Sequence, residues 1–313
     1  FYIKNSKDSV SAKIENVLKL YEIAATKYDF AQDISYNEEI SKQLLLVANT
    51  KEEYEAFTKE INPDDFELFS VKEDIIKQIS GHIGNLSVVV DDEGKDVTLN
   101  VSQIVWFDAK QIGLNQSGTF DPNLSSVEEV IETLKENINS YSYKKFTTYD
   151  HSICQYHERR EEICSKCEEV CPTVAITKDD ETKTLVFSQI DCHGCGGCVS
   201  VCPSGAIDYA PSNKESLFEM SKFYEETHPL VIPEKMNMSS LSVDLKENVL
   251  PFAVEGEKFL HEASFLTLLQ ISGSQVIFYS DFISKGSGDA IRIVNDIYQA
   301  KYGKDAILVA MNE

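Results

Sequence analysis

The sequence predicts an α+β protein in which a cysteine-rich domain is inserted between two α/β wings. Segments with helical spacing alternate with short apolar runs of strand length on both sides of the middle of the chain. All eight cysteines lie between residues 154 and 202, and most of them belong to a sequence unit that occurs twice. We therefore expect three domains, at residues 1–145, 146–212 and 213–313.

The N-terminal wing opens with a predicted helix. Residues 11–28 have helical spacing, with Ile14, Leu18, Tyr21 and Ile23 expected to cluster on one side of the helix.

The rest of this wing alternates strands and helices. KQLLLVANT (42–50) predicts a buried strand, and Thr50 is placed to cap a helix over 51–61. Residues 85–109 predict a hairpin, because two β-branched runs flank the turn-forming DDEGKD. Residues 125–138 predict a helix with Ser125 or Ser126 as its N-cap and glutamates in its first turn.

The C-terminal wing repeats a strand–helix rhythm. KESLFEMSKFYEETH predicts a helix and PLVIPE a short strand. The later segments ENVLPFAVEG, HEASFLTLLQIS, SQVIFYSDF, GDAIRIVNDIYQAKYG and KDAILVAMNE predict strand, helix, strand, helix and strand. This rhythm indicates a small parallel sheet with helices packed on it.

Composition and charge narrow the classes of partner. Acidic residues outnumber basic ones 52 to 29, which gives a net charge of −23. Such a surface repels nucleic acid and anionic lipid and suits a partner with a basic patch. No apolar run approaches the roughly 18 residues of a membrane span, so we expect no membrane insertion. Because the chain begins at Phe1 rather than Met, we expect it to belong to a longer protein.

The cysteine-rich segment is an internal duplication. CSKCEEVCPTVAI (164–176) aligns with CGGCVSVCPSGAI (195–207) at a constant offset, which predicts two similar halves, each with a short helix after its cysteines. Structural zinc sites use two well-separated cysteine pairs, whereas here three cysteines fall close together and a fourth precedes a proline. Eight thiols concentrated in one segment indicate metal and a reducing compartment, and we expect a cytoplasmic protein.

At CHGCGGCVSVCP and CSKCEEVCP the chain resembles the bacterial two-cluster, eight-iron ferredoxins, over about residues 150–210. The resemblance implies a ferredoxin-like dicluster domain with two [4Fe–4S] clusters and crossed ligation. One cluster is then expected on Cys192, Cys195, Cys198 and Cys171, and the other on Cys164, Cys167, Cys202 and a fourth ligand.

The fourth ligand of the second set is not given by the repeat, because Glu161 stands where a cysteine is expected. Three alternatives are open: Cys154, a carboxylate or imidazole such as Glu161 or a nearby histidine, or a three-iron cluster with no fourth ligand. We favour Cys154, because iron–sulfur chemistry prefers thiolate and because the intervening loop QYHERREEI closes at little entropic cost.

Residues around the cysteines are expected to tune the site. Gly194, Gly196 and Gly197 let the backbone N–H groups approach the inorganic sulfides. The positive or polar residues His151, His157, Arg159 and Arg160 are expected near the Cys164 set, which would make the two clusters inequivalent. His193 is expected to be a spacer rather than a ligand.

A second, weaker motif is Gly286-Ser287-Gly288, which follows an expected strand and precedes an expected helix. Such a segment could hold a phosphate at the helix N-terminus, with Lys285 adding charge. It lacks the third glycine and the later acidic residue of the dinucleotide-binding fingerprint. The alternative is a glycine-rich connection in which Ser287 or Asp289 caps the following helix. The motifs G-x-S-x-G, H-E-x-x-H and the P-loop are absent from the sequence.

The C-terminal wing, about 248–313, resembles the delta subunit of methyl-viologen-reducing hydrogenases through its strand–helix–strand unit, but it contains no cysteine. The resemblance therefore implies a fold and a docking role and no cluster there.

The preferred functional interpretation is an electron-transfer protein or subunit that passes single electrons to or from a redox enzyme, and not itself an enzyme. By analogy the partner would be a hydrogenase, a formate dehydrogenase or a heterodisulfide-reductase-like complex. The alternative is an oxidoreductase subunit with its own flavin or NAD site on a wing. A structural cluster in a nucleic-acid enzyme is disfavoured by the charge of −23.

Overall fold

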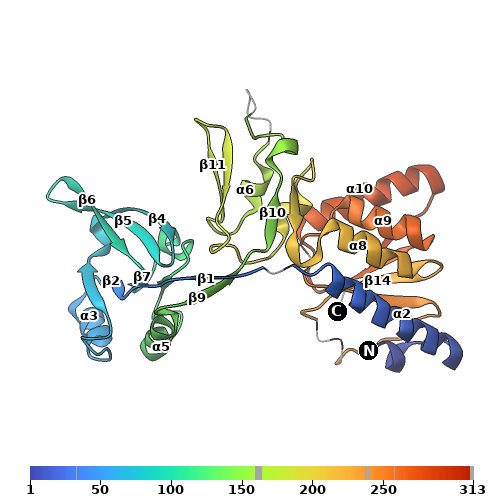
Figure 1. The fold of residues 1–313 in the computed structure, drawn as a ribbon, viewed down its shortest axis with the longest axis horizontal. Coiled ribbons are helices and arrows are strands. Elements are labelled where there is room, and N and C mark those ends of the chain that lie inside the picture. Colours follow the sequence, from blue (N-terminus) through green and yellow to red (C-terminus); the bar gives the residue numbers. More distant parts are fainter. Residues whose placement is uncertain (33, 159–163, 237, 239, 257, 311–313) are drawn as a thin grey trace.

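The computed structural model describes residues 1–32, 34–158, 164–236, 238, 240–256 and 258–310. Three parts lie in a row: an N-terminal lobe, a cysteine-rich domain and a C-terminal lobe (Figure 1). Helices and strands both contribute, so the predicted α+β class is confirmed. Within these ranges no helix is long and apolar enough to cross a membrane.

The N-terminal lobe comprises residues 35–144. Its helices and strands are β1 (Ser35–Glu38), β2 (Gln43–Val47), α3 (Lys51–Thr58), β3 (Glu67–Val71), η1 (Glu73–Ile75), β4 (Ile76–His82), β5 (Asn85–Asp92), β6 (Lys95–Val101), β7 (Gln103–Trp106), α4 (Gln111–Leu114), β8 (Thr119–Phe120), α5 (Val127–Asn137) and β9 (Tyr141–Lys144).

The middle layer of this lobe is the parallel sheet β3-β2-β7-β8. Leu44 and Leu46 of β2 pack toward α3 and α5, and Leu45 and Val47 pack toward the antiparallel sheet β4-β5-β6. Because both faces are covered, β2 is a continuous apolar run, as is usual for parallel strands. The predicted strand at 42–50 is thereby confirmed.

Local signals in this lobe were also predicted correctly, with one exception. Thr50 and Ser126 each form a capping box at the start of their helix. β5 and β6 form the expected hairpin, which turns at Glu93 and Gly94. Residues 103–106, however, do not belong to the hairpin. They form β7, which pairs with β2 in the parallel sheet, where all four of its side chains are buried.

The C-terminal lobe comprises residues 213–310 together with the first 29 residues of the chain. Its helices and strands are α1 (Tyr2–Asn5), α2 (Val10–Asp29), α8 (Lys214–Ser221), η4 (Lys222–Tyr224), β14 (His228–Pro233), β15 (Val249–Val254), α9 (Glu262–Ser272), β16 (Val276–Tyr279), α10 (Lys285–Tyr302) and β17 (Ile307–Ala310). The sheet order is β15-β14-β16-β17 and every pairing is parallel, which confirms the predicted small parallel sheet.

Helices α1 and α2 lie on this lobe although they begin the chain (Figure 1). α2 packs against α8 and η4. Near its start, the Tyr2 hydroxyl donates to Asp8 Oδ2 at 2.6 Å, and Asn248 N donates to Asp8 Oδ1 at 2.8 Å. The predicted domain boundaries at 145 and 212 stay predictions, but the first 29 residues do not pack with the N-terminal lobe.

The apolar residues predicted to cluster on one side of α2 are divided between its exposed and its packed side. Ile14, Leu18 and Tyr21 are exposed, whereas Val17, Leu20 and Ile23 pack against the core of the lobe. α2 carries apolar residues on two opposite sides, and periodicity does not say which side a neighbouring element covers.

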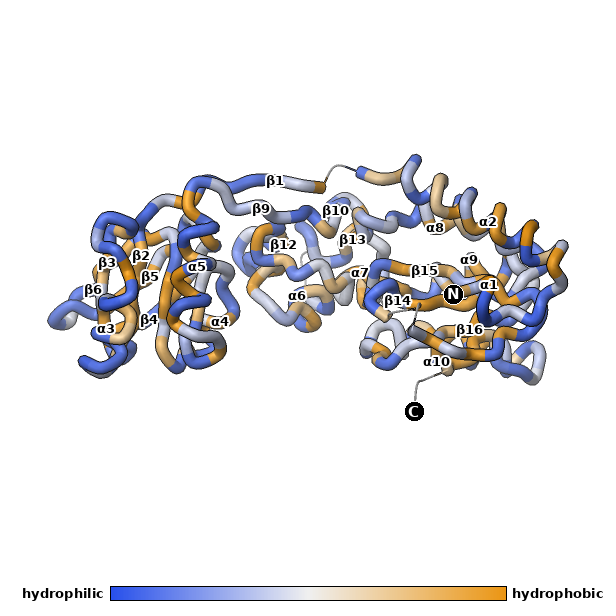
Figure 2. The backbone as a smooth tube through the Cα atoms, turned by 90° about the horizontal axis from the view of Figure 1, so that it is seen from below, coloured by the Kyte–Doolittle hydropathy of each residue, from blue (hydrophilic) through white to orange (hydrophobic). Residues whose placement is uncertain are grey.

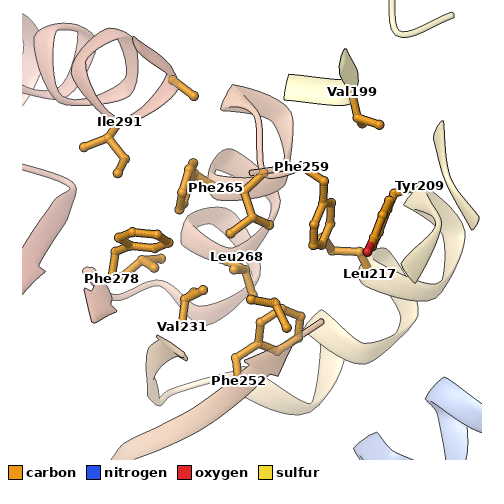
Figure 3. Packing of buried hydrophobic residues seen from close by; sticks show 14 of the residues in the cluster. Val199, Tyr209, Leu217, Val231, Phe252, Phe259, Phe265, Leu268, Phe278 and Ile291 are labelled. Atoms are coloured by element: carbon orange, nitrogen blue, oxygen red, sulfur yellow. The ribbon is translucent and has the colours of Figure 1, made fainter. Parts of the chain in front are cut away.

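One hydrophobic core runs from the cysteine-rich domain into the C-terminal lobe. Figure 3 shows Val199 and Tyr209 of the cysteine-rich domain beside Leu217 and Phe259, followed by the inner residues of the lobe. The N-terminal lobe has two separate cores. The cysteine-rich domain therefore shares a core with the C-terminal lobe but not with the N-terminal lobe, to which the antiparallel ribbon of β1 and β9 leads (Figure 2).

The predicted phosphate-binding segment is part of this packing. Gly286 and Ser287 lie inside α10, which begins at Lys285, and not in a loop before it. Ser284 caps the helix, and the buried Ser287 Oγ donates to Leu260 O at 3.1 Å. Gly286 lies so close to α7 (Gly197–Ser200) that an added Cβ would be 2.9 Å from Ser200 Cβ.

We predict that Gly286→Ala lowers the free energy of unfolding by about 1–3 kcal/mol, because the new methyl group overpacks the contact between α10 and α7. Gly288→Ala is the matched control: its Cβ would meet Ile283 Cγ2 at 3.4 Å, an ordinary contact, and should stabilise the helix by roughly 0.5–1 kcal/mol. Thermal unfolding of both variants measures the difference. A Gly286→Ala protein as stable as the control would contradict this packing.

Candidate metal centre

The cysteine-rich domain, residues 146–212, is built from small paired elements. They are β10 (Thr147–Tyr149), η2 (His151–Ile153), α6 (Lys166–Val170), β11 (Ile176–Asp179), β12 (Thr184–Phe187), α7 (Gly197–Ser200), β13 (Ile207–Tyr209) and η3 (Ala210–Ser212). β10 pairs with β13 and β11 pairs with β12, both antiparallel. Each repeat does contain a short helix, but it spans the middle cysteine, Cys167 in α6 and Cys198 in α7, and does not follow the cysteines as the duplication predicted.

Four of the predicted ligands line one cavity, which we call the Cys192 cavity. It is walled mainly by apolar residues, among them Val170, Ile176 and Phe187. Three of its cysteines come from the second repeat, and the fourth ends α6 in the first repeat. The four are Cys171, Cys192, Cys195 and Cys198.

The other four cysteines line a second cavity, which we call the Cys164 cavity. Its cysteines are Cys154, Cys164, Cys167 and Cys202. Cys154 is buried and directly follows η2, whose N-cap Asp150 accepts a hydrogen bond from Ser152 N at 2.9 Å. This capped turn thus helps to set the backbone position of Cys154. Glu161, the competing candidate, lies outside the described residues.

The donor arrangement fits a cluster better than a single ion. None of the eight cysteines forms a disulfide, so no S–S bond competes for their sulfurs. In the described part of the chain, no three His, Cys, Asp or Glu side chains converge closely enough to hold one metal ion. Four sulfurs spread around a cavity instead suit a polynuclear iron–sulfur group, whose irons lie apart from one another.

Several hydrogen-bond donors approach the sulfurs. Gly194 N donates to Cys192 Sγ at 3.5 Å, and Tyr156 N donates to Cys154 Sγ at 3.4 Å. The hydroxyl of Thr173 lies 3.6 Å from Cys171 Sγ. Backbone donors of this kind were expected at the glycines, whereas the donor at Tyr156 was not.

The hydroxyl contact also occurs in the second repeat. Ser204 Oγ lies 3.7 Å from Cys202 Sγ, which matches the pair of Thr173 and Cys171. Sequence reasoning missed both hydroxyls. The repeat itself contains the signal, because a hydroxyl residue follows each C-P pair at the same position.

Burial controls the ionisation of the thiols. It raises the pKa of Cys167 to about 12, and it also raises the pKa of Cys192 and Cys198 above the usual value. Without a metal these thiols are therefore protonated at neutral pH. Since the thiolate is the form that binds metal, loading the site must release protons.

The C-terminal lobe covers the loop that carries Cys195. Gly196 has φ +76° and precedes α7, and a Cβ on it would lie 2.6 Å from Phe259 Cβ. The Phe259 ring stacks on Tyr209 with centroids 4.7 Å apart, and the Tyr209 hydroxyl donates to Gly194 O at 3.0 Å. Only glycine allows both this backbone conformation and this close approach.

The N-terminal lobe touches the same loop from another direction. Asp191, which is buried and precedes Cys192, accepts a hydrogen bond from Ser117 N of that lobe at 3.1 Å. Asp191 O also accepts from the Thr173 hydroxyl at 2.9 Å. Both lobes therefore help to position the wall of the Cys192 cavity.

Aromatic residues border the Cys164 cavity. Tyr149 lines it, and burial together with the nearby Cys154 sulfur raises the pKa of the Tyr149 hydroxyl. The ring centroids of His151 and His157 lie 4.8 Å apart, and those of His157 and Tyr149 lie 6.3 Å apart. Arg159 and Arg160, also expected here, lie outside the described residues. His193 lines the Cys192 cavity.

Comparison with known proteins identifies this domain. The family described as the 4Fe-4S dicluster domain matches residues 162–206, a range that contains seven of the eight cysteines and excludes Cys154. An uncharacterized ferredoxin of Methanocaldococcus jannaschii is 34% identical over 64 residues, which are 20% of this chain and 94% of the relative.

Two similar proteins are subunits of larger complexes. One subunit of an ion-translocating oxidoreductase complex of Methanosarcina acetivorans is 32% identical over 71 residues, 18% of this chain. The polyferredoxin-like subunit of an aliphatic sulfonate oxidoreductase of Pyrococcus furiosus is 37% identical over 51 residues, 16% of this chain. The chain spans only 25% and 29% of the length of these two relatives.

The comparisons support the electron-transfer interpretation at the level of the domain, and the predicted iron–sulfur character is confirmed. The resemblance of the C-terminal wing to the hydrogenase delta subunit stays a prediction. Through its cysteine-rich domain, the chain belongs to the 4Fe-4S dicluster family of ferredoxins.

Proposed function

We propose that this chain is an electron-transfer subunit that holds two [4Fe–4S] clusters and exchanges single electrons with a partner redox enzyme. The observation that carries the proposal is the sorting of eight cysteines into two sets of four, each around its own cavity. The two sets are the ones expected from crossed ligation, in which each repeat lends one cysteine to the other.

The proposed ligands follow the two cavities. Cys154 completes the second set, because it is buried and lines the same cavity as Cys164, Cys167 and Cys202. The proposed ligand sets are Cys171, Cys192, Cys195 and Cys198 for one cluster, and Cys154, Cys164, Cys167 and Cys202 for the other.

A bound [4Fe–4S] cluster supplies reversible one-electron transfer. The chain contributes thiolates, exclusion of water and hydrogen bonds. Apolar walls such as Ile176 and Phe187 keep water from the Cys192 cavity, and Gly194 N offers a dipole to the sulfur of Cys192. Donors of this kind stabilise the more negative, reduced state.

The two lobes add surface that a small ferredoxin does not have, and a partner enzyme can bind there. Two of the similar proteins are subunits of oxidoreductase complexes, which supports a complex-bound role here. The charge of −23 favours a partner with a basic face. By analogy, candidate partners remain a hydrogenase, a formate dehydrogenase or a heterodisulfide-reductase-like complex.

Metal analysis tests the number of clusters. Protein purified without oxygen should contain about eight irons and about eight acid-labile sulfides per chain. A count near seven would instead indicate a three-iron cluster in the Cys164 cavity, and a count near four would contradict the two-cluster proposal.

Substitution of Cys154 tests the fourth ligand. Cys154→Ala should change the EPR signal of one reduced cluster and lower the iron content, because one iron loses its thiolate, while the signal of the other cluster persists. The control is Ile153→Ala, which alters the adjacent, half-exposed side chain and should leave iron content unchanged. If Cys154→Ala keeps the wild-type iron content and both signals, Cys154 is not a ligand.

A further inference from the structure

The outward side of α2 is an apolar stripe with no neighbour in the described chain. Successive members are three, four or seven residues apart, so they lie in one row along the helix. The exposed fractions are 77% for Val10, 59% for Ile14, 60% for Leu18, 71% for Tyr21 and 82% for Tyr28. A row of five large apolar residues, each more than half exposed, is unusual for a surface that only meets water.

The charges of α2 are sorted between its two sides. Lys27 forms ion pairs with Glu234 at 2.8 Å and with Glu255 at 3.1 Å, and Lys13 Nζ donates to Ile3 O at 3.2 Å. These two lysines are therefore engaged by the lobe, whereas Lys19, four residues after Glu15 and three before Glu22, lies beyond the acidic residues as seen from the apolar side.

The acidic residues of α2 stay on the outside. Glu15, Glu22 and Asp29 are exposed and recur every seven residues, so they form one border of the apolar stripe. The outward side of α2 is thus apolar with an acidic edge.

The helix is held firmly in this orientation. Asn16 is buried and its side chain donates to the Tyr2 hydroxyl at 2.7 Å, while Val17, Leu20 and Ile23 pack against the core. The stripe is therefore presented in a fixed form, which lowers the entropic cost of binding.

We infer that the outward side of α2 is the docking site for a protein partner with an apolar surface bordered by lysine or arginine. Charge complementarity selects this occupant, because the acidic border needs a basic one opposite it. The inference does not depend on cluster binding and adds a specific surface to the proposed subunit role.

Two other occupants fit the charges less well. If α2 packed against α2 of a second copy of this chain, Glu15 and Glu22 would lie opposite either the acidic border of the other helix or its apolar residues Val17 and Ala24. In neither arrangement would a lysine or arginine lie opposite these glutamates. An anionic membrane would be repelled by the acidic border, whereas helices that lie on membranes carry lysine and arginine on their polar face.

The test uses the full chain, made with a photoreactive phenylalanine analogue in place of Leu18 in the organism that produces it. After illumination, the cross-linked peptide is sequenced by mass spectrometry. We expect a peptide of another protein in which apolar residues lie beside lysine or arginine. The same analogue at Val97, an exposed position on β6, is the position control and should not capture that peptide.

Charge reversal completes the design. Glu15→Lys with Glu22→Lys should reduce the cross-link at Leu18 at least tenfold. Glu132→Lys with Glu136→Lys on α5 gives the same change in net charge at exposed positions and should leave the cross-link intact. Capture of another protein alone does not support the inference. A cross-link to lipid, to a second copy of this chain, to a peptide without basic residues or to nothing would overturn it, as would equal effects of the two charge variants.

Iron content separates this inference from the proposed function. The α2 variants should retain wild-type iron, because no α2 residue lines a cysteine cavity. Failure of docking with intact iron would reject the surface alone, and a low iron count in the unmodified protein would reject the two-cluster proposal alone.

Discussion

The close packing of α7 against the C-terminal lobe is the contact on which the rest of the structure depends. α7 carries Cys198, and the loop before it carries Cys192 and Cys195. Gly286 of α10 meets one side of this helix, and Phe259 meets the loop at Gly196. Because packed interiors deform little, the C-terminal lobe fixes where these three sulfurs lie. The lobe is thus part of the metal centre although it contributes no ligand.

The same contact makes the two cavities unlike each other. The wall of the Cys192 cavity is held by both lobes, through Phe259 on one side and through the hydrogen bond between Ser117 and Asp191 on the other. The Cys164 cavity is bordered by elements of the cysteine-rich domain itself, including Tyr149 and Leu185. Two similar sequence repeats therefore lie in different surroundings, and tertiary packing contributes to the difference between the two cavities.

The sequence predicted those features that depend on local chemistry. The cysteine spacing identified the iron–sulfur domain, and Thr50 and Ser126 cap helices as their neighbours indicated. Features that depend on distant contacts were missed. For Gly286 the sequence left a phosphate site and a capped connection open, because the reason for a glycine there, the approach of Ser200, comes from a segment more than 80 residues away. Which apolar side of α2 is packed depends likewise on α8, which is remote in sequence.

The order of the lobes along the chain explains the position of α2. The chain passes from α2 into β1, builds the N-terminal lobe and returns through β9 directly to β10 of the cysteine-rich domain. β1 and β9 pair antiparallel, so the two ends of the N-terminal lobe lie side by side. A lobe with adjacent ends and cores of its own can interrupt another folding unit without disturbing it. The first 29 residues consequently belong, by their packing, with a lobe whose remaining residues begin only at 213, and α2 is left on its outer surface where a partner can reach it.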